Sequence, residues 1–384
     1  MKFIHISDLH IGKTLHHYSL QEEQIDILNQ IVDISENENV DAILISGDIY
    51  DRTVPSAQAV AVFNDFLTKL RTRCKDAAIL IIAGNHDSGE RLSFAASILK
   101  NQNIYIAGIP PISEEEYIEK VEINDKYGKV NFYLLPFFKP SYVRNVTKEE
   151  GLSYNDCFAR LIKREQIDFN NERNVLLAHQ FFTGAGKETQ ISDSETISVG
   201  GLDRVDITPA LTFDYVALGH IHKQQTIGAD NVHYCGTPLK YSSSEANQEK
   251  SVLIIEIHDK DEGIKIKSIS LNPLRDVKTK RGILDEILET TSDEELDDYM
   301  SITLIDEEVL YKPKERLENK FNRILELKID NSRTREKLKT IDGSVKVQGP
   351  KEMFNTFFAD VYGRELTDNE DLIMNKIYEE IEVD

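Results

Sequence analysis

The stretch ILIIAGNHDSGERL, residues 79–92, decides how the chain is interpreted. An apolar run that is typical of a buried β-strand ends directly in Gly84, Asn85, His86 and Asp87. An amide, an imidazole and a carboxylate are costly to remove from water unless other groups pair with them. The stretch therefore predicts a strand whose end delivers polar side chains to a site, and other parts of the chain must supply their partners.

The chain has 384 residues, which is enough for two or three domains and a large core. Its three cysteines have no CxxC spacing, which indicates reduced thiols rather than a disulfide framework. The apolar N-terminal stretch is interrupted by His5, Ser7 and Asp8, and no segment approaches the length of a membrane span. We therefore expect a cytoplasmic protein with no membrane contact.

The formal net charge of −22 argues against a chain that binds nucleic acid with its whole surface. Residues 281–384 hold 27 acidic and 15 basic residues, so that −12 of this charge lies in the last quarter. Any surface that meets a polyanion must therefore be local, or must be completed by a partner.

Short apolar strands followed by polar loops recur through the first 270 residues. Helical patterns over 19–40 and 56–73 lie between the early strands, and Ser56 is a helix-start signal. These patterns predict an α/β core in which helices cover sheet layers. The expected strands are 2–7, 41–46, 77–83, 103–108, 131–136, 174–179, 214–219, 231–236 and 251–258.

The pattern changes after residue 272. We expect a polar connection over 271–282, a small α/β unit, a linker over 331–350, and two amphipathic helices over 351–384. In the small unit, 283–298 and 312–323 are helix-like, and 299–306 and 324–330 are strand-like. The predicted domains are 1–272, 273–345 with the linker, and 346–384.

Polar side chains follow five of the predicted strands, and five of the ten histidines lie there. Open α/β sheets place ligand sites at the carboxyl ends of their strands, so we expect these five strand ends to meet in one sheet. The i, i+2 pairs Asp8/His10 and His220/His222 would each point to one side of an extended segment. The candidate residues are Asp8, His10, Asp48, Asn85, His86, His179, His220 and His222.

Carboxylate, imidazole and amide groups together form a mixed nitrogen and oxygen ligand set. Such a set suits Mn²⁺, Fe or Zn²⁺ better than Mg²⁺ or Ca²⁺, and the lack of cysteine argues against a structural zinc site. Asp48 is the natural bridge between two ions, because a carboxylate has two oxygens. Any one of these motifs alone is more often an ordinary hydrogen-bonded loop, so the interpretation depends on their conjunction.

The motifs SDLHIG (7–12), GDIYD (47–51), GNHDS (84–88), HQFFTG (179–184) and GHIH (219–222) resemble those of the calcineurin-like metallophosphoesterases. The segments ALGHIHKQQ (217–225) and YCGTPLKYSSSEANQEKSV (234–252) extend the resemblance to the bacterial SbcD nuclease family, over nearly the whole chain. The resemblance implies a metallophosphoesterase αββα sandwich with a small α/β capping domain and a helical C-terminal tail.

The resemblance also implies the roles of the site residues. Asp48 would bridge two Mn²⁺ ions. His86 would face the scissile phosphate and stabilise its charge or protonate the leaving oxygen, and Asp87 would orient His86. Relatives often carry a histidine where this chain has Asp51, and the role of Asp51 stays open. Asp8, His10, Asp48 and His222 would hold one ion, and Asp48, Asn85, His179 and His220 the other.

The implied function is a Mn²⁺-dependent DNA nuclease, both a double-strand exonuclease and a single-strand or hairpin endonuclease. It would work with the ATPase SbcC in DNA end processing, repair and recombination, as a heterotetramer that contains a homodimer of this chain, in the cytoplasm and on the nucleoid. One alternative is another binuclear phosphoesterase, such as a protein phosphatase or cyclic-nucleotide phosphodiesterase. Another is a non-enzymatic scaffold. The C-terminal third favours the nuclease, because a minimal phosphatase has no need of it.

Basic and polar side chains near the ligand loops are candidates for sequence-independent contacts with DNA phosphates. The alternative for each is a solvated loop side chain. These candidates are Lys13, His16, Arg52, Arg91, Lys187, Lys223, Lys240 and Tyr241. An apolar stripe in the tail would dock onto SbcC or pack on its own domain; it contains Phe354, Phe357, Phe358, Val361, Tyr362 and Ile377.

Overall fold

The structure is a computed structural model of the chain. It describes residues 1–148, 151–184, 189–195, 204–260 and 262–335, with short stretches between 354 and 374. The chain forms two compact units, and each is described by itself. The first comprises 1–280, 291–302 and 318–326; the second comprises 281–290, 303–317 and 327–384.

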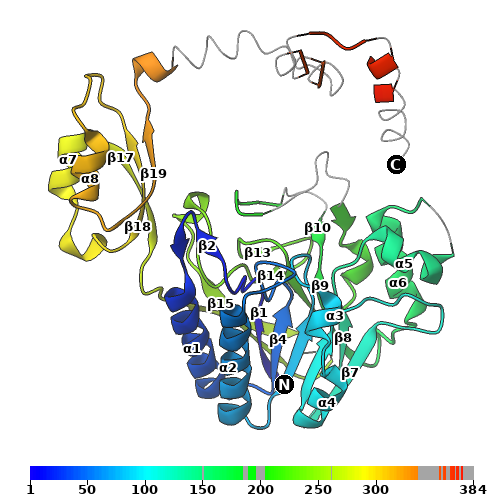
Figure 1. Ribbon diagram of the computed structural model, residues 1–384. Coiled ribbons are helices and arrows are strands. Elements are labelled where there is room, and N and C mark those ends of the chain that lie inside the picture. The colour runs from blue at the N-terminus through cyan, green and yellow to red at the C-terminus, as the bar shows by residue number, and fades with distance from the viewer. Residues whose placement is uncertain are drawn as a thin grey trace. The chain divides into compact units, whose positions relative to one another are not determined.

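Two six-stranded sheets form the centre of the first unit (Figure 1). The first sheet has the order β16 (Ile264–Ser270), β15 (Ser251–Ile257), β1 (Lys2–Ile6), β4 (Ala42–Ser46), β5 (Ala78–Ile82) and β6 (Ile104–Ala107). The second has the order β13 (Gln225–Thr226), β14 (Val232–Tyr234), β12 (Tyr215–Gly219), β9 (Arg173–His179), β8 (Gly128–Leu135) and β7 (Glu119–Asp125). Within each sheet, the strands that precede the candidate site residues run parallel to one another, so their carboxyl ends share one edge of that sheet.

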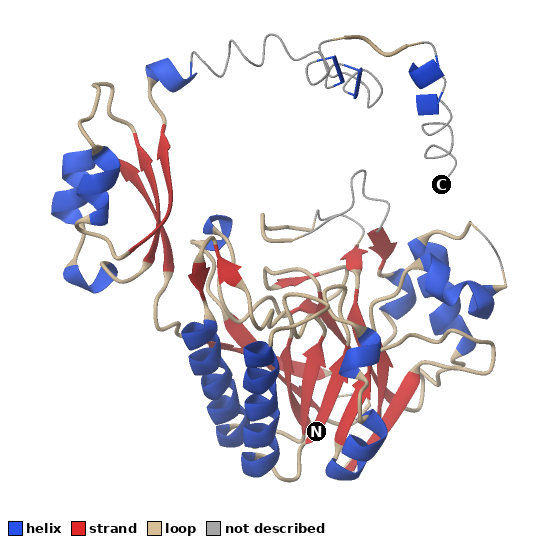
Figure 2. Ribbon diagram, in the orientation of Figure 1, coloured by secondary structure: helices blue, strands red, loops and turns tan. Residues whose placement is uncertain are grey.

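Helices cover the outer face of each sheet, as Figure 2 shows. Helices α1 (Gln21–Asn37) and α2 (Ala57–Arg73) pack on the first sheet, and α5 (Pro140–Thr147) and α6 (Tyr154–Arg164) pack on the second. A third apolar cluster fills the space between the sheets. The short elements α3 (Gly89–Leu92), α4 (Ala96–Leu99), β2 (Thr14–Leu15), β3 (Tyr18–Ser19), β10 (Phe181–Thr183) and β11 (Arg204–Asp206) lie in the connections.

The predicted αββα sandwich is confirmed, and the sequence of β4 explains it. Ala42 and Leu44 face the cluster between the sheets, while Ile43 and Ile45 face the helices. A strand that is buried on both faces must be apolar at every position, which accounts for the unbroken runs. Helix α2 begins as predicted, because the Ser56 hydroxyl accepts a hydrogen bond from the backbone N–H of Ala59 at 3.1 Å.

Two expectations from the sequence are wrong, and two strands were missed. The strand ends that carry the site residues belong to two sheets and not to one. The segment 271–282, expected as a polar connection, contains strand β17 (Val277–Gly282). Edge strands β7 and β16 were not expected. Their exposed faces carry charged side chains, so they lack the continuous apolar run that identified the central strands.

Strands β17, β18 (Tyr299–Leu304) and β19 (Arg323–Ile329) form a three-stranded sheet in that order. Helices α7 (Leu284–Thr290) and α8 (Pro313–Glu318) are shorter than the helix-like segments that predicted them. The predicted domain boundaries stay predictions, and most of the predicted tail lies outside the described residues. No helix in the described part of the chain is both long and apolar enough to cross a bilayer.

The packing between the sheets yields a stability prediction. Phe132 on β8 is fully buried there, with its ring centroid 5.7 Å from that of Phe3. We expect Phe132→Ala to lower the free energy of unfolding by about 3–5 kcal/mol, because it leaves a cavity that the sheets cannot fill. Val54→Ala, at a side chain that is 64% exposed, should change it by less than about 0.5 kcal/mol. Urea denaturation measures both, and equal losses would contradict this account of the core.

Candidate metal centre

The carboxyl ends of β1, β4 and β5 in one sheet meet those of β9 and β12 in the other. Backbone hydrogen bonds join the first two loops, from Asp8 N–H to the Gly47 carbonyl and from His10 N–H to the Asp48 carbonyl, both at 3.0 Å. Across the sheets, the Nδ1–H of His179 donates to the Ser46 carbonyl at 2.7 Å. Five loops are therefore held together at the seam between the sheets.

One half of the centre gathers around His10. Its Nε2 lies 3.1 Å from the Nε2 of His222 and 3.7 Å from a carboxylate oxygen of Asp48. Asp8, His10 and His222 can each bring a ligand atom within 4.8 Å of the others. A nitrogen-to-nitrogen distance near 3 Å is what two imidazole ligands about 2.1 Å from one ion would show.

The other half gathers around Asn85. Its side-chain oxygen lies 3.0 Å from the Nε2 of His179 and 2.9 Å from the Nδ1 of His220. The Nε2 of His179 also lies 3.4 Å from Asp48, so this carboxylate contacts histidines of both halves. The structure thus brings all seven predicted ligands together in the two expected groups. Their role as ligands stays a prediction.

The predicted reason for this convergence is wrong in one respect. Asp8, His10, Asp48 and His220 are not extended; their φ angles are 53°, 43°, 49° and 102°. A left-handed backbone is unfavourable for residues with a Cβ, and such strain concentrates at functional sites. Sharp turns, and not the two-residue repeat of a strand, therefore aim these side chains inward.

Gly84 is needed for close approach and not for a special backbone angle. A Cβ atom at this position would overlap the carboxylate and the backbone nitrogen of Asp48. The missing side chain therefore lets the loop after β5 lie directly against the loop after β4.

The side chains that face one another fit divalent cations. Asp8 and Asp48 are buried, and in the described structure the ion pairs of Asp48 are with His10 and His179 only. The buried Nδ1 of His10 has no hydrogen-bond partner among the described residues. Two buried carboxylates without a lysine or arginine partner are costly unless cations balance them. The donor set therefore supports divalent metal ions.

His86 and Asp87 lie beside this cluster with roles that differ in part from those expected. The Nδ1–H of His86 donates to the backbone carbonyl of Asp51 at 2.9 Å, and its backbone N–H donates to Asp48 at 2.8 Å. The carboxylate of Asp87 instead accepts backbone hydrogen bonds from Gly84, Ile49 and Tyr50 at 2.9–3.1 Å. Asp87 thus fixes two ligand loops, and the direct orientation of His86 that we expected is not what the structure shows.

Burial and the nearby Asp48 charge raise the pKa of Asp87 to about 6, even though the three backbone N–H groups favour its ionised form. Asp51 pairs with Lys13 at 2.8 Å through its side chain while its backbone holds His86. Asp51 therefore holds His86 and Lys13 at the edge of the cluster.

The predicted DNA contacts differ in exposure and in the partners that the structure gives them. His16, Arg52 and Arg91 are exposed. Lys13 is paired with Asp51, and Lys223 donates to the side chain of Gln190. Two assignments are contradicted, because Lys240 is bound to Asp276 and to the Ala246 carbonyl, and Tyr241 is buried with its hydroxyl donating to Leu9. Lys187 lies outside the described residues.

The sequence did not reveal a group of polar side chains behind His222. The Oγ of Ser194 lies 2.7 Å from the Nδ1 of His222 and donates to Glu245 at 2.6 Å. Glu195 accepts the backbone N–H of His222 at 2.6 Å, and Glu245 pairs with Lys250 at 2.6 Å. Glu245 and Lys250 lie in the segment 234–252, which carries part of the family resemblance but indicates no role for them, and the sequence analysis found no signal for Ser194 or Glu195.

Comparison with known proteins agrees with this geometry. Residues 1–224 match the family described as calcineurin-like phosphoesterase. Residues 271–362 match the SbcD C-terminal family, described as type 5 capsule protein repressor C-terminal domain. The SbcD subunit of the nuclease SbcCD from Staphylococcus epidermidis is 32% identical over 295 residues, which are 75% of this chain and 74% of that protein.

The chain belongs to the SbcD family of calcineurin-like phosphoesterases. Members of this superfamily are metal-dependent hydrolases of phosphate esters, and the cluster at the sheet seam is where such chemistry would take place in an SbcD protein.

Two solved structures are also similar. One is titled "GAP50 the anchor in the inner membrane complex of Plasmodium", with 16% identity, 72% of this chain and 90% of that chain covered, and a TM-score of 0.39. The other is a dimetal phosphatase from Danio rerio, with 10% identity, 71% and 99% covered, and a TM-score of 0.38. At these scores neither likeness adds to the SbcD assignment.

Proton release should accompany metal binding. Burial alone would lower the pKa of His179, but the charges of Asp48 and Asp8 outweigh it and raise the pKa to about 9. In the metal-free protein the His179 ring is therefore an imidazolium at pH 7, with a hydrogen on both nitrogens. Ligation requires the neutral ring, so one of these protons must leave. We expect proton release on Mn²⁺ binding, and an apparent affinity that rises with pH until about pH 9.

Calorimetric titration with Mn²⁺ at pH 7, in two buffers of different ionisation enthalpy, measures this release. His179→Asn keeps a polar side chain without the titrating group and should release fewer protons. A binding enthalpy that is the same in both buffers would show that His179 is already neutral.

Proposed function

We propose that this chain is a Mn²⁺-dependent DNA nuclease subunit that works with an SbcC ATPase, as a double-strand exonuclease and a single-strand or hairpin endonuclease. The observation that carries the proposal is the convergence of seven nitrogen and oxygen donors from five strand ends, with His86 beside them. The similarity to the SbcD subunit of an SbcCD nuclease supports DNA as the substrate. The mixed ligand set supports Mn²⁺ over Mg²⁺.

The geometry supports hydrolysis without a covalent enzyme intermediate. Asp8, His10, Asp48 and His222 would hold one ion, and Asp48, Asn85, His179 and His220 the other. The chemistry that two divalent ions supply when bound is Lewis acidity, which activates water and neutralises charge on a phosphate. The protein itself contributes fixed ligand positions, because the strained turns and the backbone bonds to Asp87 hold the loops before substrate arrives.

His86 would act on the substrate. Because the Asp51 carbonyl can only accept, the Nδ1 of His86 carries a hydrogen. The Nε2 is left for a phosphate oxygen, and it can donate to that oxygen only as an imidazolium, which carries a second hydrogen on Nε2. The ring of His86 lies edge-on to that of His10, with centroids 4.8 Å apart. This position suits a group that stabilises charge on the phosphate or gives a proton to the leaving oxygen.

The exposed side chains of His16, Arg52 and Arg91 are the DNA contacts that this structure supports best. Arg52 follows Asp51 directly, and its side chain is 82% exposed. Such groups would hold phosphates without reading sequence. In a chain of net charge −22 they give only a local grip, which favours a partner that supplies more of the DNA-binding surface.

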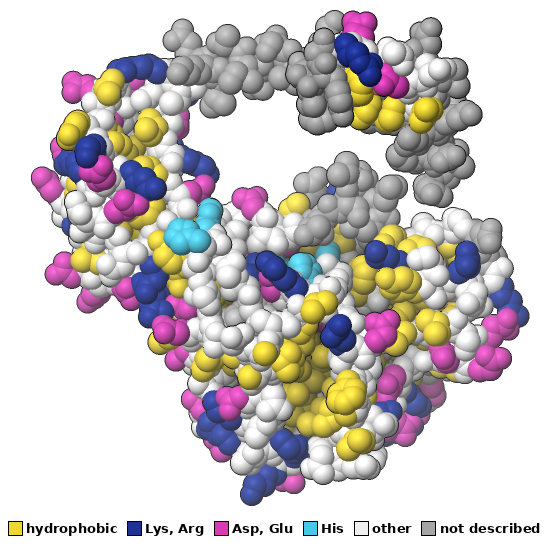
Figure 3. Space-filling model, viewed as in Figure 1, with side chains coloured by type: hydrophobic (Ala, Val, Ile, Leu, Met, Phe, Trp, Pro, Cys, Tyr) yellow, Lys and Arg dark blue, Asp and Glu magenta, His cyan; other side chains and the backbone are white. Residues whose placement is uncertain are grey.

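We also propose two protein contacts. The tail would dock onto SbcC through its apolar stripe, in which the rings of Phe354 and Phe358 have centroids 6.2 Å apart; Phe357, Val361, Tyr362 and Ile377 lie outside the described residues. Two copies of the chain would pair through Phe94 and Ile98, which are 83% and 67% exposed. Figure 3 shows hydrophobic side chains gathered on the face that carries α3 and α4.

A substrate comparison tests the activity. The chain, with and without SbcC and ATP, is incubated with Mn²⁺ and linear duplex DNA, hairpin DNA, a phosphopeptide or a cyclic nucleotide. We expect cleavage of both DNAs, none with Asp48→Asn, and little of the other two substrates. Hydrolysis of the phosphopeptide or cyclic nucleotide alone would identify a different phosphoesterase, and inertness toward all four would favour a scaffold.

Replacement of His86 separates catalysis from metal binding. His86→Asn should lower the rate of DNA cleavage by about 10²–10⁴-fold, the usual contribution of a general acid. Mn²⁺ affinity should stay at the wild-type level, because the contact of His86 with Asp48 is made by the backbone N–H. Cleavage kinetics and calorimetry measure the two effects. A variant that loses metal along with activity would place His86 among the ligands.

A further inference from the structure

A chain of polar groups leads from His222, on the side opposite His10, through the half-buried Ser194 to the buried Glu245 and Lys250. Ser194 contacts the Nδ1 of His222 at 2.7 Å and donates its hydroxyl hydrogen to Glu245 at 2.6 Å. Glu245 is fully buried and pairs with the ammonium of Lys250, which is also buried. Side chains from two separate parts of the sequence thus form one continuous path from a lysine to a predicted metal ligand.

The direction of the hydrogen bonds follows from the chemistry of the groups. The carboxylate of Glu245 lies 2.6 Å from the ammonium of Lys250, and this ion pair favours the ionised form of the carboxylate. An ionised carboxylate can only accept, so Ser194 must donate to it. Its oxygen is then left to accept a hydrogen from the Nδ1 of His222. The lone pair of His222 therefore lies on Nε2, 3.1 Å from His10 and facing the cluster.

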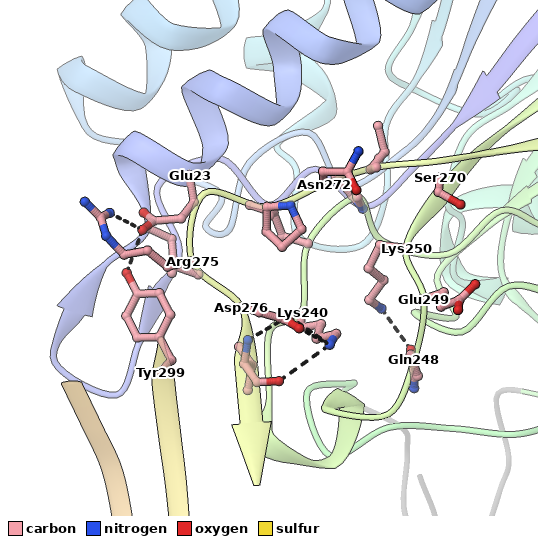
Figure 4. Close-up of a pocket in the computed structure, with 16 residues that line it drawn as sticks. Glu23, Lys240, Gln248, Glu249, Lys250, Ser270, Asn272, Arg275, Asp276 and Tyr299 are labelled. Atoms are coloured by element: carbon pink, nitrogen blue, oxygen red, sulfur yellow. Dashed lines mark hydrogen bonds and ion pairs between the residues drawn. The ribbon is translucent and has the colours of Figure 1, made fainter. Parts of the chain in front are cut away.

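Lys250 also holds the backbone of the same ligand loop. Its ammonium donates to the carbonyl of His222 at 3.0 Å, to Thr237 at 2.7 Å and to Gln248 at 2.9 Å. Figure 4 shows Lys250 and Gln248 on the wall of a pocket of about 340 Å³, beside a separate pair formed by Lys240 and Asp276. Backbone and ring of His222 are thus both tied to the Glu245–Lys250 pair.

We propose that Lys250, Glu245 and Ser194 are positioning residues that fix the tautomer and orientation of His222 for metal binding. The arrangement is a carboxylate–histidine pair with a serine inserted between the two groups. Partners of this kind keep a ligating ring oriented, and their loss typically weakens metal binding by about 10–100-fold. The buried ion pair is costly to desolvate, so a functional role gives a reason for its presence. The inference rests on the metal centre proposed above.

Two variants and a matched control test the proposal on the full chain. Ser194→Ala breaks the path at its most exposed member, and Glu245→Gln removes the charge that orders it. Asp276→Asn is the control, because it removes a carboxylate that pairs with Lys240 at the same pocket and lies outside the path to His222. Ser194→Thr keeps the hydroxyl and should therefore retain the wild-type Mn²⁺ affinity.

Calorimetric Mn²⁺ titration gives the first readout. We expect Ser194→Ala and Glu245→Gln to lose about 10–100-fold in affinity for one of two ions, with Asp276→Asn and Ser194→Thr unchanged. The second readout is the ¹⁵N spectrum of the histidine rings in the metal-free protein. The wild type should show His222 as a single Nδ1–H tautomer, and Ser194→Ala should show a mixture.

The outcomes separate this proposal from the one on which it rests. Wild-type affinity and an unchanged His222 tautomer in Ser194→Ala would overturn the positioning role. A wild-type protein that binds no Mn²⁺ would overturn the metal centre, while the tautomer spectrum would still decide the role of Ser194. If Glu245→Gln fails to fold because Lys250 is left unpaired, Ser194→Ala and Ser194→Thr decide alone.

Discussion

The structure depends on the burial of two carboxylates, Asp8 and Asp48, at the seam between two sheets. Each sheet is held by its own apolar cluster and by the cluster they share, but no apolar contact can compensate a buried negative charge. The compensation comes from imidazoles of both sheets, and His179 in particular carries a raised pKa because of these charges. In a metal-free protein the negative charge of these carboxylates is therefore only partly balanced, and divalent cations would balance the rest. The metal centre thus depends on both sheets of the sandwich, because each sheet supplies some of its side chains.

The same burial explains why the loops are strained. Four of the seven predicted ligands have a left-handed backbone, which costs of order 1–3 kcal/mol per residue. Such conformations persist only where the surroundings impose them. The surroundings here are the three backbone N–H groups bound by Asp87, the His179 bond to Ser46 across the sheets, and the close contact at Gly84. These contacts restrain the short turns that carry the predicted ligands, at the ends of the strands of both sheets.

The central strands and the predicted ligands could be identified from the sequence, because both depend on local patterns. The doubly buried strands appear as apolar runs, and each ligand follows such a run directly. The assignment of the strands to two sheets was not readable from these runs, since β4 and β9 have the same apolar character. The roles of Asp87, Lys240 and Tyr241 were mistaken or incomplete because they depend on which backbone or side chain lies opposite in space. Ser194, Glu245 and Lys250 were missed for the same reason: each is an ordinary polar residue until the fold places it behind His222.

The acidity of the chain can be reconciled with DNA as a substrate through the same distinction between buried and exposed charge. Lys240 and Lys250 are tied to carboxylates and carbonyls, and Lys13 to Asp51, so these cations serve the structure. The cations that remain for phosphates near the cluster are the exposed Arg52 and Arg91. Since each phosphate neutralised adds to affinity, so few contacts give only weak binding to DNA. The site itself would attract a phosphate only once divalent ions outweigh Asp8 and Asp48. Metal binding would therefore be a precondition for phosphate binding as well as for chemistry, and the proposed SbcC partner would supply the remaining contacts with DNA.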